Sequence, residues 1–369
     1  LFLHLFDRAS LFITDRIITI KTEFSQPMEE FVLNLHIHSV YSDGTWVHQK
    51  IAEAGILANL DGLIITDHNI LVNHLEGYFF KKKKKILLII GQEIHDKNLN
   101  PPKNHLLAFG QSQDLSIFAE KPQQLINQVK KNGGISIIAH PYERELPQVH
   151  EPDISWVDWS VEGFDGIEIW NHLSELKNVS RNWFQLLCHI FFPSTYATSA
   201  HPMAIQKWDQ LLLSGKKIFA AGGSDAHNLR IKKAFLVKWV FPYLFHFQSV
   251  NNHLLLREPL SGEFLMDKMK VLNAIREGNF FIGYDYIVSS RGFRFYAQGR
   301  NETAIMGEEV ELDGSVTLHI TLPEEAECKL IHNGTVIKQW NNQKICMYIT
   351  KSTGYYRVEC TISFLGITR

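Results

Sequence analysis

The sequence is poor in cysteine. Its 369 residues include four cysteines, at positions 188, 328, 346 and 360, and no two of them form a Cys-x-x-Cys pair. This pattern fits neither a disulfide framework nor a thiolate metal site, and it favours a reducing compartment. A serine nucleophile is also unsupported, because the chain contains no Gly-x-Ser-x-Gly motif.

Long apolar runs are missing as well. No segment reaches the roughly 20 apolar residues that a transmembrane helix needs. Charged residues at positions 7, 8, 15 and 16 interrupt the apolar start of the chain, which has no basic first region and no clear cleavage site. We therefore do not interpret it as a signal peptide. We expect no membrane partner and a cytoplasmic location.

The charges of the chain nearly balance. Lys and Arg number 37 and Asp and Glu 39, which gives a formal net charge of -2. A global positive field that would attract nucleic acid is therefore not expected. Five consecutive lysines at 81–85 could form a phosphate or nucleic-acid patch. A solvated helix end is the favoured interpretation, because no aromatic residues are interleaved with them.

Histidine, in contrast, is abundant. The chain contains 18 histidines, and about half lie in or beside six segments in which an apolar run ends in His, Asp or Glu. Side chains at the carboxyl ends of parallel strands converge on one mouth, so these residues are expected to meet. The segments are LHIHSVYSDG (35–44), TDHN (66–69), GQEIH (91–95), AHP (139–141), IEIWN (167–171) and GGSDAH (222–227).

Short apolar runs alternate with helical patterns over most of the chain, which predicts a parallel sheet closed or nearly closed into a barrel. We divide the chain into a leader with one strand at Arg16–Phe24 (1–30), a barrel (31–289) and a smaller domain (290–369). Predicted barrel strands are Phe31–His38, Gly62–Thr66, Ile86–Ile90, Ile135–Ala139, Gly166–Trp170, Lys217–Ala221, Ala234–Phe241 and Phe280–Gly283. Predicted helices are Val47–Asn59, Pro122–Lys131, Arg181–Phe191, Met203–Leu213 and Asp267–Glu277.

From about Ser290 the pattern changes to strands divided only by turn signals. Asn333-Gly334 between two alternating runs predicts a β-hairpin. No helical window separates these strands, so we predict a small antiparallel β-sandwich. None of the six segments falls in it.

The candidate ligands share one chemistry. His36 and His38 are two apart on a predicted strand and should point to one face, and Asp225 with His227 repeats the spacing. Glu93 ends a buried strand, where a carboxylate is costly unless it is paired or bound to metal, and its two oxygens could serve two cations. The full set is His36, His38, Asp43, His68, Glu93, His105, His140, Asp225 and His227. Nine imidazole and carboxylate ligands predict two or three ions of Zn, Mn or Fe.

These motifs resemble the PHP (polymerase and histidinol phosphatase) superfamily of metal-dependent hydrolases, and the whole chain is most similar to its two-domain CehA/McbA-like metallohydrolases. The resemblance implies a distorted (β/α)7 TIM-like barrel. It also implies three ligand sets: His36, His38, Glu93 and Asp225; Asp43, His68 and His227; and Glu93, His105 and His140. Glu93, Asp225 and His227 are taken as catalytic residues.

Residues beside the motifs could shape the site. Asp67 could orient an imidazole or cap a turn, and both interpretations stay open. Substrate contact and structural hydrogen bonding are the alternatives for Glu168 and Asn171. Three loop residues could meet an anionic substrate, or be ordinary surface residues: Tyr142, Arg144 and Arg230. His95, His172 and His201 match no ligand position and are expected to face solvent or support the ligands.

The sequence thus predicts a metal-dependent phosphoesterase in which a metal-bridged hydroxide attacks a small-molecule phosphate ester. Hydrolysis of a carbamate or carboxylic ester at the same site is the alternative, and it would favour a more apolar pocket. The third hypothesis is a degenerate module without catalytic activity. The presence of all nine ligands speaks against it.

Overall fold

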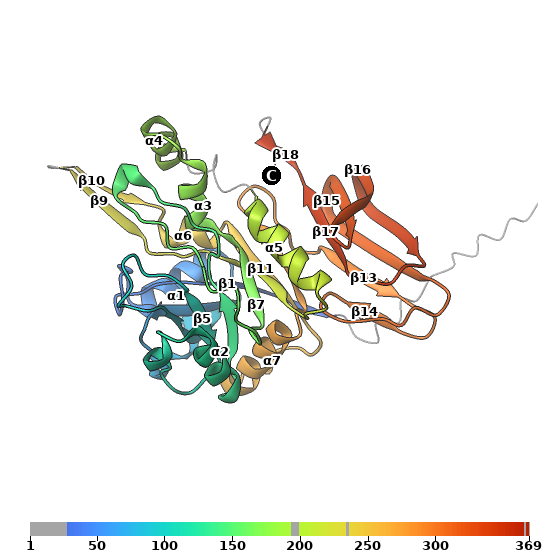
Figure 1. The fold of residues 1–369 in the computed structure, drawn as a ribbon, viewed down its shortest axis with the longest axis horizontal. Helices are drawn as coiled ribbons and strands as arrows, with labels where there is room; N and C mark the ends of the chain where they lie inside the picture. Colours follow the sequence, from blue (N-terminus) through green and yellow to red (C-terminus); the bar gives the residue numbers. More distant parts are fainter. Residues whose placement is uncertain (1–27, 193–198, 234–235, 365–366, 369) are drawn as a thin grey trace, which may run out of the picture.

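The computed structural model describes residues 28–192, 199–233, 236–364 and 367–368. Figure 1 shows two parts, a larger one in which helices surround a curved sheet and a smaller one built from strands. The first sheet runs from Glu29 to Tyr284, and the second begins at Arg294. The predicted strand Arg16–Phe24 lies outside the described residues.

The larger sheet has ten strands, in the order β12-β11-β1-β2-β4-β5-β6-β7-β8 with β3 paired to β4. Most of its strands are apolar on both faces, because helices cover the outside and side chains fill the inside. The strands are β1 (Glu29–Leu35), β2 (Gly62–His68), β3 (Gly77–Lys81), β4 (Lys84–Ile94), β5 (Leu106–Phe109), β6 (Ile135–Ile138), β7 (Gly166–Asn171), β8 (Phe219–Gly223), β11 (Val250–Leu256) and β12 (Phe280–Tyr284).

The sheet curls until its two ends nearly meet. The backbone NH of Ser224, just after β8, donates to the Leu35 carbonyl at 3.0 Å, and Ile37 and Ala226 form a parallel bridge. Asn252 of β11 exchanges two side-chain hydrogen bonds with the backbone of Gly222, at 2.7 and 2.9 Å. The predicted barrel-like sheet is thereby confirmed. The regular (β/α)7 repeat is not, because β5 and β11 run antiparallel to their neighbours.

Two apolar layers hold the sheet in place. Alternate side chains of β1, β2 and β4, such as Leu33, Ile64 and Leu87, pack with α7 (Phe264–Arg276). The intervening side chains, such as Leu63 and Leu88, pack with α1 (His48–Leu57). A third cluster joins β5, β6 and β7 to α2 (Pro122–Lys131) and α5 (Pro202–Leu213). This packing fixes the strand ends, and with them the site.

The remaining elements around the barrel were placed less well by the sequence. Two further helices, α3 (His172–Val179) and α6 (Tyr243–Phe247), were not predicted, whereas α4 (Trp183–Phe191) was. The prediction that Ala234–Phe241 belongs to the barrel sheet is wrong. Its described part, β10 (Leu236–Val240), pairs only with β9 (Leu229–Lys233) in a separate two-stranded sheet.

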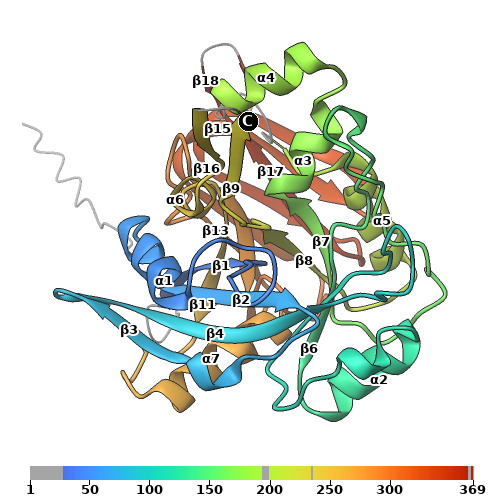
Figure 2. The same cartoon turned by 90° about the vertical axis from the view of Figure 1, so that its left-hand side faces the viewer.

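The five lysines are not a helix end. They form the turn and flanks of the β3–β4 hairpin, in which Lys81 pairs with Lys84 and Lys82 has a φ of +55°. Figure 2 shows this hairpin as a long extension of the sheet edge. Lys81 forms an ion pair with Glu53 at 2.8 Å, and Lys85 lies 4.1 Å above the centre of the Tyr78 ring. These local partners fit a solvated hairpin tip.

The smaller part is a second, antiparallel sheet. Its centre is the hairpin of β15 (Val316–His332) and β16 (Thr335–Thr350), and the predicted turn at Asn333-Gly334 is confirmed. Both turn residues have positive φ, +49° and +78°. β13 (Arg294–Gln298) and β17 (Tyr356–Thr361) pair with opposite halves of β15, and β14 (Thr303–Ile305) pairs with β13. β18 (Ser363–Phe364) and β19 (Ile367–Thr368) form a separate pair.

The strands β13 to β17 form one bent sheet and not the two facing sheets of the predicted sandwich. β15 and β16 change register between Thr321 and Ala326. Side chains from both halves of β15, such as Leu318 and Leu330, then share one apolar cluster.

Candidate metal centre

The nine candidate ligands all lie at one rim of the barrel. His36, His38 and Asp43 follow β1, His68 ends β2, and Glu93 lies near the end of β4. His140 follows β6, and Asp225 and His227 follow β8. His105 precedes β5, but β5 is antiparallel to its neighbours, so its start lies at the rim where the other strands end. The convergence expected from the strand ends therefore occurs.

Glu93 is the centre of the cluster. Its side chain is only 1% exposed, and five imidazoles surround it. Oε1 faces His105 Nδ1 at 2.6 Å and His140 Nε2 at 2.9 Å. Oε2 faces His36 Nε2 and His38 Nε2, both at 3.2 Å, and His68 Nδ1 at 3.0 Å. The two oxygens thus face different groups of imidazoles, as a carboxylate that bridges two cations would require.

Asp225 completes a four-atom set on one side of Glu93. Its Oδ1 lies 3.6 Å from His36 Nε2 and 3.2 Å from His38 Nε2. Four ligand atoms about 2.1 Å from one tetrahedral ion stand about 3.4 Å apart. The four measured separations among His36, His38, Glu93 and Asp225, 3.2–3.6 Å, match these edges.

Asp43 brings together a second set nearer the surface. Its Oδ1 lies 3.2 Å from His227 Nε2, and its Oδ2 lies 3.5 Å from His68 Nε2. Its side chain is 54% exposed, unlike the ligands around Glu93. Ligand atoms of these three residues and His38 lie within 4.8 Å of one another. This outer set is the part of the cluster that a substrate in solution would reach first.

Backbone strain accompanies three of the candidate ligands. His36, His140 and Asp225 have positive φ values of +64°, +24° and +51°. Residues other than glycine rarely adopt this region, and such strain is concentrated at functional sites. The expectation that His36 and His38 share a face by strand alternation was too simple. β1 ends at Leu35, and the turn at His36 brings the two rings to the same carboxylate.

Glu168 on β7 supports the ligands from behind. It is 1% exposed, its Oε1 lies 2.9 Å from His36 Nδ1, and its Oε2 accepts a hydrogen bond from the His140 backbone NH at 2.7 Å. The Asn171 side-chain amide donates to the same carboxylate at 3.0 Å. Gly223 permits this approach, since a Cβ there would lie 1.7 Å from Glu168 Oε1. Of the two alternatives, structural hydrogen bonding describes Glu168 and Asn171 better than substrate contact.

Asp67 holds the loop that carries Asp43. Its carboxylate accepts hydrogen bonds from the backbone NH and hydroxyl of Ser39, at 2.7 and 2.6 Å, and from the Ser42 hydroxyl at 2.6 Å. Ser42 also lies 3.4 Å from His38 Nδ1. Turn capping is therefore the direct role of Asp67, and its effect on an imidazole runs through Ser42.

The carboxylates raise the proton affinity of several imidazoles. Burial alone would lower the pKa of His68, but Glu93 and Asp43 outweigh it and raise that pKa to about 10. Burial is likewise outweighed at His140, where Glu143 and Glu93 raise the pKa to about 9. The pKa of Glu93 itself is well below its ordinary value despite burial, because of the surrounding imidazoles.

The buried polar atoms at the centre fit a cation. Four of them make no hydrogen bond within the described part of the chain: His36 Nε2, His38 Nε2, His68 Nδ1 and Glu93 Oε2. Buried polar atoms are normally satisfied, and so many exceptions at one point indicate a missing partner. Imidazole and carboxylate donors without thiolate suit Zn, Mn or Fe.

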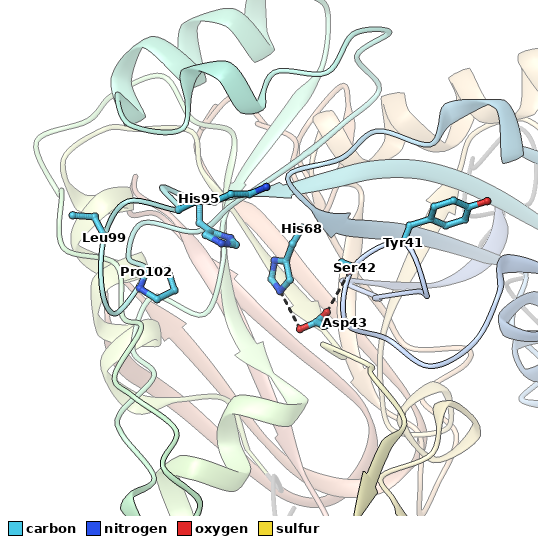
Figure 3. A pocket seen from close by; sticks show the side chains of 8 residues that line it. Tyr41, Ser42, Asp43, His68, His95, Leu99 and Pro102 are labelled. Atoms are coloured by element: carbon cyan, nitrogen blue, oxygen red, sulfur yellow. Dashed lines mark hydrogen bonds and ion pairs between the residues drawn. The ribbon is translucent and has the colours of Figure 1, made fainter.

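A pocket of about 470 Å³ opens over the outer set. Figure 3 shows His68 and Asp43 between His95, Leu99 and Pro102 on one side and Tyr41 on the other. Lys97 also lines the pocket. His95, expected to face solvent or support the ligands, does both: it lines the pocket, and its ring stacks on His105 at 4.3 Å between centres. In the sequence, only the spacing Glu-x-His-x-Lys at 93–97 indicated that His95 and Lys97 lie beside the candidate ligand Glu93.

Of the other suggested substrate contacts, Tyr142 and Arg144 are not among the residues that line this pocket. Tyr142 stacks on Trp159 and His201, with ring centres 6.1 and 5.7 Å apart. Arg144 is exposed on the following loop, and Arg230 belongs to β9. His172 does not face solvent either, since it is buried and its Nδ1 lies 2.8 Å from His246 Nδ1.

Comparison with known families gives one match. Residues 34–170 match the family model of the PHP domain. This segment of the chain is similar to the PHP domain. The matched segment includes seven of the nine candidate ligands, from His36 to His140, and ends before Asp225 and His227. The predicted superfamily is thereby confirmed.

Solved structures give weaker likenesses, and a search of curated proteins gives no match. A two-domain protein from Bacteroides vulgatus, described as containing a predicted PHP-like metal-dependent phosphoesterase, is 16% identical with a TM-score of 0.43. That match covers 87% of this chain and 85% of the other. An amidohydrolase from Chromobacterium violaceum with bound sulfate and no metal is 12% identical, with a TM-score of 0.30 over 53% of this chain and 87% of the other. The closer resemblance of the PHP domain here to CehA/McbA-like enzymes stays a prediction.

Proposed function

We propose that this protein is a metal-dependent hydrolase that cleaves phosphate esters. The observation that carries the proposal is Glu93, whose two oxygens face different groups of imidazoles within one buried cluster. Such an arrangement is suited to two or three divalent cations, and the PHP match supports the same class of chemistry. Cations held there supply Lewis-acid activation of a water molecule and of the substrate oxygens.

The residues divide the work. His36, His38, Glu93 and Asp225 would hold one cation, Asp43, His68 and His227 a second, and Glu93, His105 and His140 a third. Glu168 holds the His36 ring at Nδ1 and also accepts a hydrogen bond from the His140 backbone NH. These two contacts keep both imidazoles oriented toward Glu93. Asp67 fixes the loop that brings Asp43 to the outer set.

Lys97 favours a phosphate ester over an apolar ester. It lines the pocket with His68 and Asp43, where a cation can pair with an anionic substrate group. The tryptophans that could have built an aromatic ester pocket are not among the eight residues that line this one. Trp156 packs in the core instead, and Trp183 lies exposed on α4. We therefore propose a small-molecule phosphate ester as the substrate.

The test compares three substrates in parallel with metal-loaded protein: a nucleoside monophosphate, a phosphodiester and an aryl carbamate. Turnover of a phosphate ester that is lost in His38→Ala supports the proposal. Turnover of the carbamate alone would overturn the phosphoesterase assignment. Unchanged phosphate ester turnover in His38→Ala would show that the activity belongs to another site.

Lys97→Met tests the substrate class more finely. We expect KM for the phosphate ester to rise about tenfold with little change in kcat, because a charge-assisted contact is worth on the order of 1.5 kcal/mol. Lys83→Met, at the tip of the β3–β4 hairpin, is the matched control and should leave KM unchanged. An unchanged KM in Lys97→Met would remove this residue from the binding site.

A further inference from the structure

Three of the four cysteines, far apart in the sequence, lie together in the smaller domain. Cys328 of β15 is directly opposite Cys360 of β17 in the antiparallel ladder. Cys346 of β16 shares an apolar cluster with Cys328. The fourth, Cys188, belongs to α4 of the larger domain.

The pair Cys328 and Cys360 has the geometry of a disulfide site. Directly opposite residues in an antiparallel pair have Cα atoms about 4.5–5.5 Å apart, and disulfides join Cα atoms about 4.4–6.8 Å apart. Opposite residues also point to the same face of the sheet. A bond between them therefore needs no rearrangement of the two strands.

The two thiols differ in access. Cys360 is exposed, whereas Cys328 is completely buried, and Cys346 is 2% exposed. A reagent in solution can reach Cys360 directly, whereas Cys328 is shielded from solvent. The three sulfur atoms are not among the described groups whose ligand atoms all lie within 4.8 Å of one another, so a shared metal fits them less well.

We propose that Cys328 and Cys360 form a redox-active dithiol that oxidation by a small-molecule disulfide converts into a Cys328–Cys360 disulfide. The Cys360 thiolate attacks one sulfur of the reagent, forming a mixed disulfide and releasing one small thiolate. The Cys328 thiolate then attacks Cys360 Sγ and releases the second small thiolate. The two cysteine protons leave on the two small thiols, which balances the reaction.

The disulfide would tie the edge strand β17 to the centre of its sheet. β17 also carries Arg357, which forms two hydrogen bonds with Asp209 of α5, at 2.8 and 2.9 Å. Oxidation would thus stabilise one of the strands that contact the larger domain. This inference does not depend on the metal centre, so it stands or fails separately from the proposed hydrolase activity.

The test exposes the full-length protein to excess oxidised glutathione, counts remaining thiols after denaturation, and maps disulfides by peptide mass spectrometry. We expect the loss of two of the four thiols, a Cys328–Cys360 cross-link and a rise in Tm that a reductant reverses. Cys360→Ser should lose both the cross-link and the rise in Tm. Cys188→Ser, the matched control, should keep both.

Two results would overturn the inference. Glutathione attached to Cys360 while Cys328 stays reduced would show that the second step does not occur. A cross-link between Cys328 and Cys346 in the wild-type chain would show that the cross-strand pair is not the reactive one.

Discussion

At the scale of single residues, the site rests on carboxylates buried among imidazoles. Isolated buried carboxylates are costly, and they persist when they are paired or bind metal. Glu93 and Glu168 are each 1% exposed, and both face candidate ligands, Glu93 from within the cluster and Glu168 from behind it. Their proposed roles therefore differ: Glu93 would bind the cations directly, whereas Glu168 positions the candidate ligand His36.

Glu168→Gln tests this difference. The amide keeps the size of the side chain but weakens the hydrogen bond to His36 Nδ1, so we expect metal affinity to fall about 10–100-fold without loss of the fold. Metal competition with a chelator measures the affinity, and circular dichroism checks the fold. Glu162→Gln, an exposed loop variant with a 76% exposed side chain, is the control. Equal affinity in both variants would deny Glu168 a positioning role.

Metal binding should release protons. The pKa of His68, about 10, and that of His140, about 9, keep both imidazoles protonated near neutral pH when no cation competes. Because a ligand nitrogen must lose its proton, affinity should increase from pH 6 to pH 9. Calorimetric titration at pH 7 in buffers of different ionisation enthalpy measures the released protons. Binding without proton release would contradict these pKa shifts.

The sequence predicted the nine candidate ligands because each ends or begins an apolar run, and that signal is local. It did not predict the positive φ of His36, His140 and Asp225, which depends on how β1 and β8 meet. Lys97 and His95 were missed as pocket residues for a related reason. Their side chains line the pocket only because the loop between β4 and β5 folds over the rim.

At the scale of elements, β11 closes the sheet and links it to the smaller domain. Its His253 is completely buried between Glu30 of β1, at 2.8 Å, and Asp285, at 2.9 Å. Glu30 also pairs with Arg294 of β13 at 2.6 Å. This strand was not predicted, because its apolar pattern is interrupted by Asn251, Asn252 and His253. The side chains of these three residues bond to partners on β1, on β8 and after β12. These tertiary contacts stabilise the strand although its own sequence does not favour one.

His253→Asn should destabilise the protein by about 2–4 kcal/mol, because it leaves Glu30 and Asp285 without their shared cation. Although burial opposes it, the two carboxylates raise the pKa of His253, so its contribution is full below its ordinary value of 6.5 and is lost as the pH rises through the raised value. Burial opposes the shift of Glu30 too, but His253 and Arg294 lower its pKa to about 2. Its contribution is full above 4.5 and is lost toward pH 2.

Denaturant unfolding of wild type and variant over a pH series checks this linkage. The difference in free energy of unfolding should be largest between pH 4.5 and 6.5 and smaller at high pH. His150→Asn, at an exposed loop position whose positive φ asparagine also adopts, should change little at any pH. A difference that grows toward high pH would contradict the assigned charge of His253.

At the scale of the whole molecule, the two domains meet through α5 and β17. Asp209 of α5 accepts hydrogen bonds from Arg357 and, at 2.8 Å, from the Tyr355 hydroxyl. Figure 1 shows α5 between the barrel and the second sheet. No helix of the described residues is long and apolar enough to cross a membrane. The change in sequence pattern near Ser290 predicted the order of the two domains. The contact at Asp209 joins residues 146 and 148 positions apart, so no local pattern predicted it.

Asp209→Asn should loosen this contact. We expect a loss of about 1–3 kcal/mol, because the paired guanidinium and the phenol lose a charged acceptor. Differential scanning calorimetry should show the smaller domain melting earlier than in the wild type. Asp158→Asn, on a surface loop of the larger domain, is the control. Equal melting curves for both variants would mean that the contact contributes no stability.

In the proposed site one buried carboxylate, Glu93, organises a cluster of two or three cations. The most direct measurement is the metal content of fully loaded, full-length protein by mass spectrometry of the elements, for the wild type and Glu93→Gln. We predict at least two transition-metal ions per wild-type chain and a loss of more than one in the variant, because Glu93 faces two ligand sets. Fewer than two ions in the wild type, or an unchanged number in Glu93→Gln, would contradict the account.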